Sequence, residues 1–420
     1  MDDDETMVPR DSGLLQDSHG TLMFVGDVAP MSHLQSVRHF LTALAGSDGF
    51  PSGLSCDSLL EQTNPVTGND TSFSWPIASS TVDAAVHAFS DATHGVLDIG
   101  GPNQLGQQIK HWMSDHPVAH NVGSAANYLI LAIGLQHSDE QLANTYYCKA
   151  RDITMARLTF DTNPLTVQSL LLIAIYMLRG CQPNGSYIYF GLACRVSYSI
   201  GMHRTEVNAR YGKDVQAQRE RLYKSLKVTD LLISIGLGRP PALYDLDCTV
   251  PYKMPFHDST GDMSALDDIC QVLIIMENII IEVYGGQRKV SLQLTRQFSQ
   301  RLKGWADERM PRLNAMVKGP REAHRSWTVI GACHALATYY FSVMLLARPF
   351  LMYEAYQMLR RKENSTSGNA AARGRRTLAE GCVDAACCLV ELVLGLTRDN
   401  RLPQKLPVLT YVSHHTKRKT

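Results

Sequence analysis

Apolar residues at helical spacing fill most of the chain. Residues 121–136 (NVGSAANYLILAIGLQ) are apolar nearly all round, which is typical of a buried helix. Residues 164–180 have a proline near the first turn and a glycine after the last, as helices prefer. Further helices are predicted at 80–97, 138–158, 187–204, 217–238, 263–284, 291–304, 324–350 and 378–396. No period-two alternation between turns, strand–helix–strand alternation or fixed repeat occurs, so the sequence predicts an all-α, multi-helical fold.

The start of one of these helices can be predicted to the residue. Ser138 precedes the segment 138–158, and Gln141 follows Ser138 by three residues. This spacing is that of a capping box, in which the serine side chain accepts a backbone N–H of the first turn. We therefore expect Ser138 to be the N-cap.

The charge is balanced overall but unevenly distributed. The 420 residues include 40 basic and 40 acidic side chains. Residues 1–109 contain fourteen acidic residues and only Arg10 and Arg38 as bases, a net charge of −12. Residues 1–75 are rich in Ser, Gly, Asp and Thr and are predicted to be mostly disordered, with a short helix near 36–45. The predicted organisation is an acidic, largely disordered arm at 1–79, a helical domain at 80–410 and a basic tail at 411–420.

The ten cysteines are scattered, and no C-x-x-C pair occurs. A tetrahedral zinc site needs thiolates or histidines at regular short spacings, so no metal and no cofactor are predicted in this chain. The opening residues MDDDETMVPR lack the basic and apolar regions of a secretory signal. The longest apolar stretch, residues 170–178, is shorter than the ~20 residues that span a bilayer. We expect reduced thiols inside the cell and no membrane association.

The segment SIGLGRPPALYDLDC (residues 234–248) raises the question of chemistry, because glycines, prolines and aspartates follow an apolar helical run. A dinucleotide-binding loop would need a third glycine and a following helix, whereas prolines without backbone N–H groups follow here. Asp245 and Asp247 would share one face of an extended segment and could form a carboxylate pair. Local turning of the backbone or pairing with Arg239 is the favoured interpretation of both aspartates.

The segment could also form a corner between packed helices. Gly236 and Gly238 can end the helix in a left-handed conformation, and the prolines that follow keep the exit extended. Arg239 is expected to pair with a carboxylate such as Asp230, Asp245 or Asp247. The residues assigned to this structural corner are Gly236, Gly238, Arg239, Pro240, Asp245 and Asp247.

Residues 266–272 (LDDICQV) are similar to the D-D-x-x-D pattern of helical isoprenoid synthases, which holds magnesium. Position 271 is Gln, so the third carboxylate is missing, and Asp267 and Asp268 fit the start of a helix. No G-x-S-x-G, H-E-x-x-H or P-loop occurs. We predict no catalytic residues and no enzyme. The alternative is an all-α enzyme of small-molecule, isoprenoid-like metabolism.

Two basic groups flank a polar spacer late in the chain. Arg361 and Lys362 precede the spacer ENSTSGNAAA, and Arg373, Arg375 and Arg376 follow it. This spacing fits a bipartite nuclear-import signal, and a solvated loop between helices explains it equally well. No aromatic residues interleave these bases, so a stacking platform for single-stranded nucleic acid is not expected.

Three landmarks occur in order. The first is residues 143–204 (ANTYYCKARDITMARLTFDTNPLTVQSLLLIAIYMLRGCQPNGSYIYFGLACRVSYSIGMHR), the second residues 219–252 (RERLYKSLKVTDLLISIGLGRPPALYDLDCTVPY) and the third residues 336–351 (LATYYFSVMLLARPFL). Together they resemble the middle regulatory region of the fungal-specific zinc binuclear-cluster transcription factors. The resemblance covers residues 90–410 approximately and rests on the ordered set, because each motif alone is weak.

The resemblance implies an all-helical regulatory domain of a nuclear regulator of RNA polymerase II transcription. It implies that the glycine–proline corner has a packing role. The family reads DNA through an N-terminal six-cysteine zinc cluster, but only Cys56 precedes Cys148 here. We therefore expect the zinc cluster to be missing from this chain, with DNA reached only through a partner. The other expected partners are transcription machinery or coactivators, a small-molecule effector and a second subunit in a homo- or heterodimer.

Overall fold

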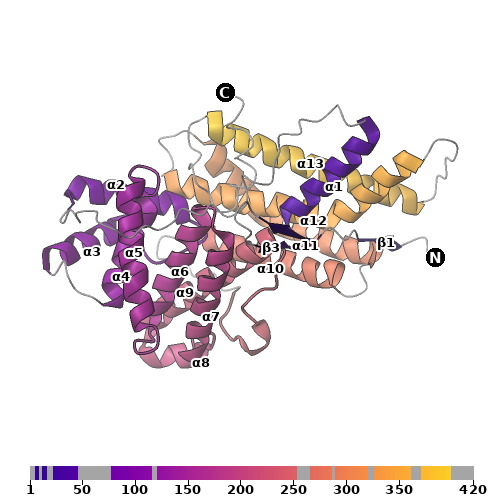
Figure 1. Cartoon of the computed structure of the whole chain (residues 1–420). Coiled ribbons are helices and arrows are strands. Elements are labelled where there is room, and N and C mark those ends of the chain that lie inside the picture. Colours follow the sequence, from indigo (N-terminus) through magenta and orange to yellow (C-terminus); the bar gives the residue numbers. More distant parts are fainter. Residues whose placement is uncertain are drawn as a thin grey trace. The chain divides into compact units, whose positions relative to one another are not determined.

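The computed structural model describes residues 5–8, 12–16, 22–45, 77–115, 121–252, 265–285, 289–319, 326–360 and 370–398. Within these ranges the chain forms thirteen α-helices and four short strands, which confirms the prediction of an all-α fold (Figure 1). The chain divides into two compact units. Unit 1 takes its described residues from 1–58, 234–240 and 257–402, and unit 2 takes its described residues from 59–233 and 241–256.

Unit 2 is a layered set of helices around one almost completely buried helix. Its elements are α2 (Ser79–Thr93), α3 (Pro102–Asp115), α4 (Val122–Leu135), α5 (Glu140–Arg157), α6 (Pro164–Arg179), α7 (Pro183–Ser199), α8 (Thr205–Asn208), the 3-10 helix η3 (Ala209–Tyr211), most of α9 (Lys213–Leu237) and the 3-10 helix η4 (Asp245–Asp247). Helix α4 packs against α2, α5 and α6, so it is buried on nearly every side. This arrangement explains why residues 121–136 are apolar all round.

Helix α4 approaches α2 so closely that a side chain would not fit between them. A Cβ added to Gly134 would lie 2.0 Å from the carbonyl oxygen of Ala85. Aromatic packing holds the neighbouring helices, because the rings of Tyr147 and Tyr176 stack with their centroids 4.3 Å apart.

The cap of α5 differs from the predicted one. Asp139 is the N-cap, and its side chain accepts a hydrogen bond of 3.0 Å from the Leu142 N–H. Ser138 instead donates to the Leu135 carbonyl at the end of the preceding helix, at 3.5 Å. Both residues are good caps, and the short connection between α4 and α5 places Asp139 at the first turn.

Unit 1 is built around α12 (Ser326–Arg360), the longest helix of the described residues. It packs against α10 (Ala265–Ile279), α11 (Leu292–Lys318) and α13 (Ala370–Arg398). In Figure 1 α12 and α13 run side by side. Helix α10 continues into a π-helical turn at Ile280–Tyr284. Although α12 has the length and composition of a membrane span, 72% of its apolar window is buried inside the structure, as in a core helix.

The described residues of the predicted acidic arm are structured and belong to unit 1. They form the strands β1 (Glu5–Met7), β2 (Gly13–Gln16) and β3 (Leu22–Val25) and the helix α1 (Pro30–Ala45). Strand β1 pairs antiparallel with β4 (Lys289–Ser291), and β2 pairs antiparallel with β3. Residues 46–76 of the arm and the predicted tail at 411–420 lie outside the described residues. The predicted domain boundaries stay a prediction.

Candidate functional site

The corner SIGLGRPP ends helix α9 with a defined hydrogen-bond pattern. The Arg239 N–H donates to the Ser234 carbonyl at 2.8 Å, and the Gly238 N–H donates to the Ile235 carbonyl at 3.2 Å. Gly238 has a φ of +65°, whereas Gly236 lies inside α9. This pair of bonds around a left-handed residue is a Schellman motif, so Gly238 supplies the reversal that ends the helix.

An N-terminal segment packs directly onto this helix end. The Gly26 N–H donates to the Leu237 carbonyl at 2.9 Å, and a Cβ on Gly26 would lie 1.9 Å from the Gly238 carbonyl oxygen. The Arg239 guanidinium donates through Nε to the Phe24 carbonyl at 3.1 Å. The segment therefore supplies polar partners for the helix end, and it leaves room only for glycine at the contact.

The third sequence landmark reaches the same segment. Arg348 of α12 is buried and donates through Nη1 to the Asp27 carbonyl at 2.9 Å. Ser32 in the first turn of α1 donates to the Gly26 carbonyl at 2.8 Å. The arginines of the LGRPP and LLARPF motifs thus hold neighbouring carbonyls of one loop. We call this loop, residues 24–29 with its contacts to Arg239 and Arg348, the N-terminal clamp.

The segment that leaves the corner is fastened to α9 within unit 2. The Asp230 carboxylate is fully buried and accepts the Ala242 N–H at 3.0 Å and the Leu243 N–H at 2.7 Å. The Tyr198 hydroxyl accepts the Tyr244 N–H at 2.7 Å. These are the backbone amides that follow the two prolines, so their hydrogen bonds go to side chains of the helices behind them.

Asp245 and Asp247 have different cationic partners. Asp245 pairs with Lys227, whose side chain is fully buried, with 2.8 Å between Nζ and Oδ2. Asp247, with 73% of its side chain exposed, pairs with Arg204 and lies 3.5 Å from His203 Nε2. Asp245–Asp247 form the 3-10 turn η4 instead of the expected extended backbone, and the two carboxylates meet separate cations. The cationic partners shown for the two aspartates lie on α9 and after α7, and the pairing of Arg239 with a carboxylate stays a prediction.

Tyrosines complete the polar group around Asp245. The Tyr252 hydroxyl donates to Asp245 Oδ1 at 3.3 Å and lies 3.3 Å from Cys248 Sγ. Burial raises the pKa of Tyr252 and of the neighbouring Tyr223 well above the usual range, so both hydroxyls stay protonated. These side chains hold the segment that leaves the corner in place by neutral and ionic hydrogen bonds, so their role is structural.

One aspartate of the isoprenoid-synthase alternative, Asp268, lies in buried ion pairs of unit 1. Asp268 is completely buried near the start of α10 and pairs with Arg312 and Arg309, the latter at 3.5 Å. Burial raises the pKa of Asp268, and the two guanidinium groups counter that effect. A magnesium site needs carboxylates that face a cavity, and Asp268 faces two cations instead. Across the described residues no group of three or more potential metal ligands occurs.

The predicted import signal lies partly on a helix. Arg361 and Lys362 lie outside the described residues, whereas Arg373, Arg375 and Arg376 lie in the first turns of α13. Arg375 packs over the Tyr353 ring at 5.1 Å, and Arg373 and Arg376 are exposed.

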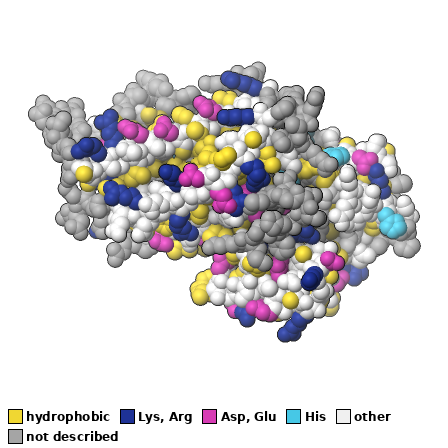
Figure 2. Space-filling model, turned by 180° about the vertical axis from the view of Figure 1, so that it is seen from behind, with side chains coloured by type: hydrophobic (Ala, Val, Ile, Leu, Met, Phe, Trp, Pro, Cys, Tyr) yellow, Lys and Arg dark blue, Asp and Glu magenta, His cyan; other side chains and the backbone are white. Residues whose placement is uncertain are grey.

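On the face drawn in Figure 2, basic and acidic side chains are interspersed among apolar ones. Such mixing is unlike the basic stripe that contacts a nucleic-acid backbone.

Sequence reasoning missed the residues that receive the corner. Lys227 occupies a helical run with Leu222, Leu226 and Leu237, and a cation in such a run signals a buried partner. Phe24 and Gly26 carry no local signal, because their contacts join residues more than two hundred positions apart.

Comparisons with known proteins agree with the three landmarks. Residues 113–294 match the family described as fungal specific transcription factor domain. The filamentous growth regulator 27 of Candida albicans is 21% identical over 389 residues, covering 84% of this chain and 48% of that protein. A thiamine repressible genes regulatory protein of Schizosaccharomyces pombe is 26% identical over 161 residues, with coverages of 34% and 20%. An acetamidase regulatory protein of Aspergillus fumigatus is 27% identical over 183 residues, with coverages of 41% and 22%.

The chain thus spans about half the length, or less, of these curated relatives. No solved structure matches it. The resemblance drawn from the landmarks is confirmed, since the match contains all of the first landmark (residues 143–204) and all of the second (residues 219–252). The third landmark (residues 336–351) lies beyond the match. Residues 113–294 of this chain form a fungal specific transcription factor domain, and the relatives of the chain are fungal transcriptional regulators.

Proposed function

We propose that this chain is the regulatory part of a nuclear regulator of transcription by RNA polymerase II. The observation that carries the proposal is the match of residues 113–294 to the fungal specific transcription factor domain. The relatives named as regulatory proteins support it over as much as 84% of the chain. The corner residues support it as well, because their polar groups are engaged in holding the backbone.

Regulation of this kind needs two states of the helical body with different affinities for a ligand or partner. We propose that the transcription machinery or a coactivator is one partner. A second copy of the chain or a longer family member is another, and DNA is contacted through that partner. The N-terminal clamp is a suitable element for a two-state device, because it joins α1, α9 and α12 through a few backbone hydrogen bonds.

A tethering experiment tests the regulatory function. The chain is fused to an unrelated sequence-specific DNA-binding domain and expressed in a fungal host with two reporters. One reporter has a minimal promoter and the other a constitutively active promoter, so that activation and repression are both detectable. We expect one reporter to change several-fold relative to the DNA-binding domain alone. Unchanged expression of both reporters by a fusion that accumulates in the nucleus would contradict the proposal.

Nuclear import has its own test. The chain is tagged with a fluorescent protein, and Arg361 and Lys362 are changed to Ala together with the exposed Arg373 and Arg376. We expect nuclear fluorescence that falls toward the cytoplasmic level in the variant. A matched control changes Arg301 and Lys303 of α11 to Ala, and it should leave localisation unchanged. Equal nuclear fluorescence of the wild type and the four-residue variant would remove the import role from these bases.

The expected lack of a zinc cluster in this chain is tested on the purified protein. Zinc is measured by atomic emission, and DNA binding is measured by mobility shift with mixed-sequence duplexes. We expect less than one zinc per chain and no shift at physiological salt. Stoichiometric zinc or a salt-resistant shift would show that this chain contacts DNA by itself.

A further inference from the structure

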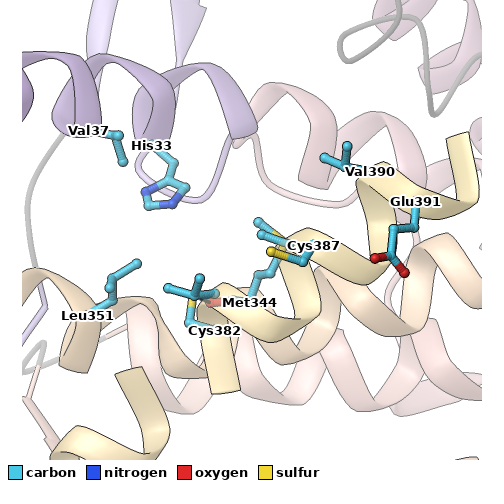
Figure 3. A pocket seen from close by; sticks show the side chains of 10 residues that line it. His33, Val37, Met344, Leu351, Cys382, Cys387, Val390 and Glu391 are labelled. Atoms are coloured by element: carbon cyan, nitrogen blue, oxygen red, sulfur yellow. Dashed lines mark hydrogen bonds between the residues drawn. The ribbon is translucent and has the colours of Figure 1, made fainter. Parts of the chain in front are cut away.

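An apolar groove lies in unit 1 between α1, α12 and α13. It has a volume of about 500 Å³. Its lining includes His33 and Val37 of α1, Met344 and Leu351 of α12, and Cys387 and Val390 of α13. Figure 3 shows these side chains around the groove, with the His33 ring directed into it from α1. The volume is within the range of about 300–1,000 Å³ that small-molecule sites occupy in proteins.

The α13 wall of the groove is apolar and partly exposed. Val383 and Val390 are 48% and 50% exposed, and the Cys387 thiol between them is exposed too. These residues are spaced by four and three positions, so they form one stripe of the helix. Leaving such a stripe in water costs roughly 25 cal/mol for each Å² of apolar surface, so an apolar occupant is favoured.

His33 places a polar ring inside this largely apolar lining. Its Nδ1 atom is buried and has no hydrogen-bond partner among the described residues. Burial lowers the pKa of His33 to about 3, and the Arg348 guanidinium adds to the effect. The ring is therefore neutral near pH 7, with one N–H donor and one acceptor nitrogen. A buried polar atom without a partner is costly, so a ligand group that bonds to it would be stabilised.

The charges around the groove define the ligand class. Glu391 contributes a carboxylate to the lining, and burial raises the pKa of the Cys382 thiol to about 11, so this thiol is neutral. Arg348 approaches His33 from α12, but its guanidinium already donates to the Asp27 carbonyl. An anionic head group would meet Glu391 and a neutral imidazole, and it would lose its hydration because no Lys or Arg is among the described residues that line the groove.

We propose that this groove binds an uncharged, largely apolar small molecule that places one hydroxyl or carbonyl group against His33. The ligand bridges α1 and α13 over α12. Because α1 begins directly after the N-terminal clamp, occupancy of the groove biases the position of the loop that receives Arg239 and Arg348. The proposal that the groove binds a ligand rests on the geometry of the groove. Only the further claim that this ligand acts as the effector rests on the proposed function.

A fluorescent probe of the same chemistry tests the site directly. Nile red is uncharged and apolar and carries a carbonyl group. We expect saturable binding of one probe per full chain, with blue-shifted emission. Val390→Trp fills the groove from a half-exposed position and should raise the probe Kd at least ten-fold. Leu394→Trp, one turn farther along α13 and also partly exposed, is the matched control and should change Kd less than two-fold.

The hydrogen bond and the charge preference have separate measurements. His33→Phe keeps the ring and removes the polar nitrogens, and it should raise the probe Kd about three- to ten-fold, as the loss of one hydrogen bond predicts. Decanol should displace Nile red at a concentration at least ten-fold lower than decanoate does. Decanol should also slow the alkylation of Cys387 by N-ethylmaleimide, measured by peptide mass spectrometry. All variants are checked by circular dichroism and thermal unfolding.

Each alternative outcome decides against part of the proposal. Equal effects of Val390→Trp and Leu394→Trp would mean that the probe binds elsewhere on the surface. Unchanged binding in both variants would rule the groove out. Decanoate as potent as decanol would overturn the ligand class. If the probe binds in the groove but the tethered reporter does not respond to decanol, the binding site is supported and its role as the effector site is rejected.

Discussion

The backbone of Gly26 lies against the backbone of Gly238. The Gly26 N–H bonds to the Leu237 carbonyl at 2.9 Å, and a Cβ on Gly26 would fall 1.9 Å from the Gly238 carbonyl oxygen. The helix end that the family motif marks is therefore completed by residues more than two hundred positions earlier. The contact explains why both residues are glycine. Gly238 has a positive φ, and Gly26 has no room for a side chain.

We expect Gly26→Ala to lower the free energy of unfolding by about 1–3 kcal/mol, the usual cost of overpacking a close contact. Gly236→Ala is the matched control on the same corner, because nothing lies within 4 Å of its Cβ and the residue is helical. The control should be neutral or more stable by about 0.5 kcal/mol. Urea unfolding followed by circular dichroism measures both, and equal stability of the two variants would contradict the contact.

The two aspartates of the corner should differ in their effect on stability. Asp245→Asn removes the carboxylate 2.8 Å from the buried Lys227 ammonium, and we expect a loss of about 2–3 kcal/mol. Asp247→Asn changes an exposed pair and should cost less than about 1 kcal/mol. Adding Lys227→Met to Asp245→Asn should restore part of the loss, since the buried ammonium is then removed as well. Chemical denaturation of the four proteins checks this order, and similar losses for both single variants would refute it.

His33 should make the protein less stable in mild acid. Burial holds its pKa near 3 in the folded state against about 6.5 in the unfolded state. The unfolded chain therefore binds the extra proton between these values, and the stabilisation present above pH 6.5 is lost as the pH falls toward 3. The groups near the ring are Arg348, Glu391, Cys382 and Cys387. Between pH 7 and pH 5, His33→Phe should reduce the loss of unfolding free energy by roughly 1–2 kcal/mol.

The measurement compares urea midpoints of wild type and His33→Phe at several pH values, so that other titrating groups cancel. The ring proton resonances of His33 give an independent readout and should not titrate between pH 8 and 5. A histidine that titrates near pH 6.5 would show that the imidazole is solvated, which would also weaken the groove as a binding site.

Cys181 follows α6 with a φ of 56°, the non-glycine residue of the described chain with a positive φ. A left-handed conformation costs a residue with a Cβ about 1–2 kcal/mol. We expect Cys181→Gly to stabilise the protein by about 0.5–1 kcal/mol, after allowing for the greater freedom of glycine in the unfolded chain. Cys181→Ala keeps the strain and serves as the control, which should show no gain. Thermal unfolding of the two variants separates backbone strain from the loss of the thiol.

The local pattern of the sequence is sufficient to predict the helices but not their partners. Residues 121–136 and 164–180 become α4 and α6 because their apolar content and terminal residues act within a few turns. Whether Asp139 or Ser138 is the N-cap of α5 depends on the residue at which α4 ends. The sequence pattern predicts that end only to within about one residue. Within the segment expected to be extended, Asp245–Asp247 form a 3-10 turn, in which Asp245 binds the distant Lys227.

The N-terminal clamp shows most clearly which contacts the sequence pattern does not predict. Residues 24–29 (FVGDVA) lie within the segment 1–75, whose high content of Ser, Gly, Asp and Thr predicts disorder when it is read alone. Their backbone groups bind to Leu237, Arg239 and Arg348, which lie far away in the sequence. The groove was missed for the same reason, because it forms only when α1 packs beside α12 and α13. A single sequence carries no local mark of such distant pairings.

The clamp has a practical consequence for anyone who dissects this protein into fragments. A fragment that starts at the first long helix of unit 2 would seem a natural choice, but it would lack Phe24 and Gly26. The Leu237 carbonyl at the end of α9 would then lose the Gly26 N–H, and Arg239 and Arg348 would lose the carbonyl groups of Phe24 and Asp27. Proteolysis or expression boundaries placed before residue 22 would preserve the native end of α9, whereas those placed after residue 30 would report on a molecule altered at its signature motif.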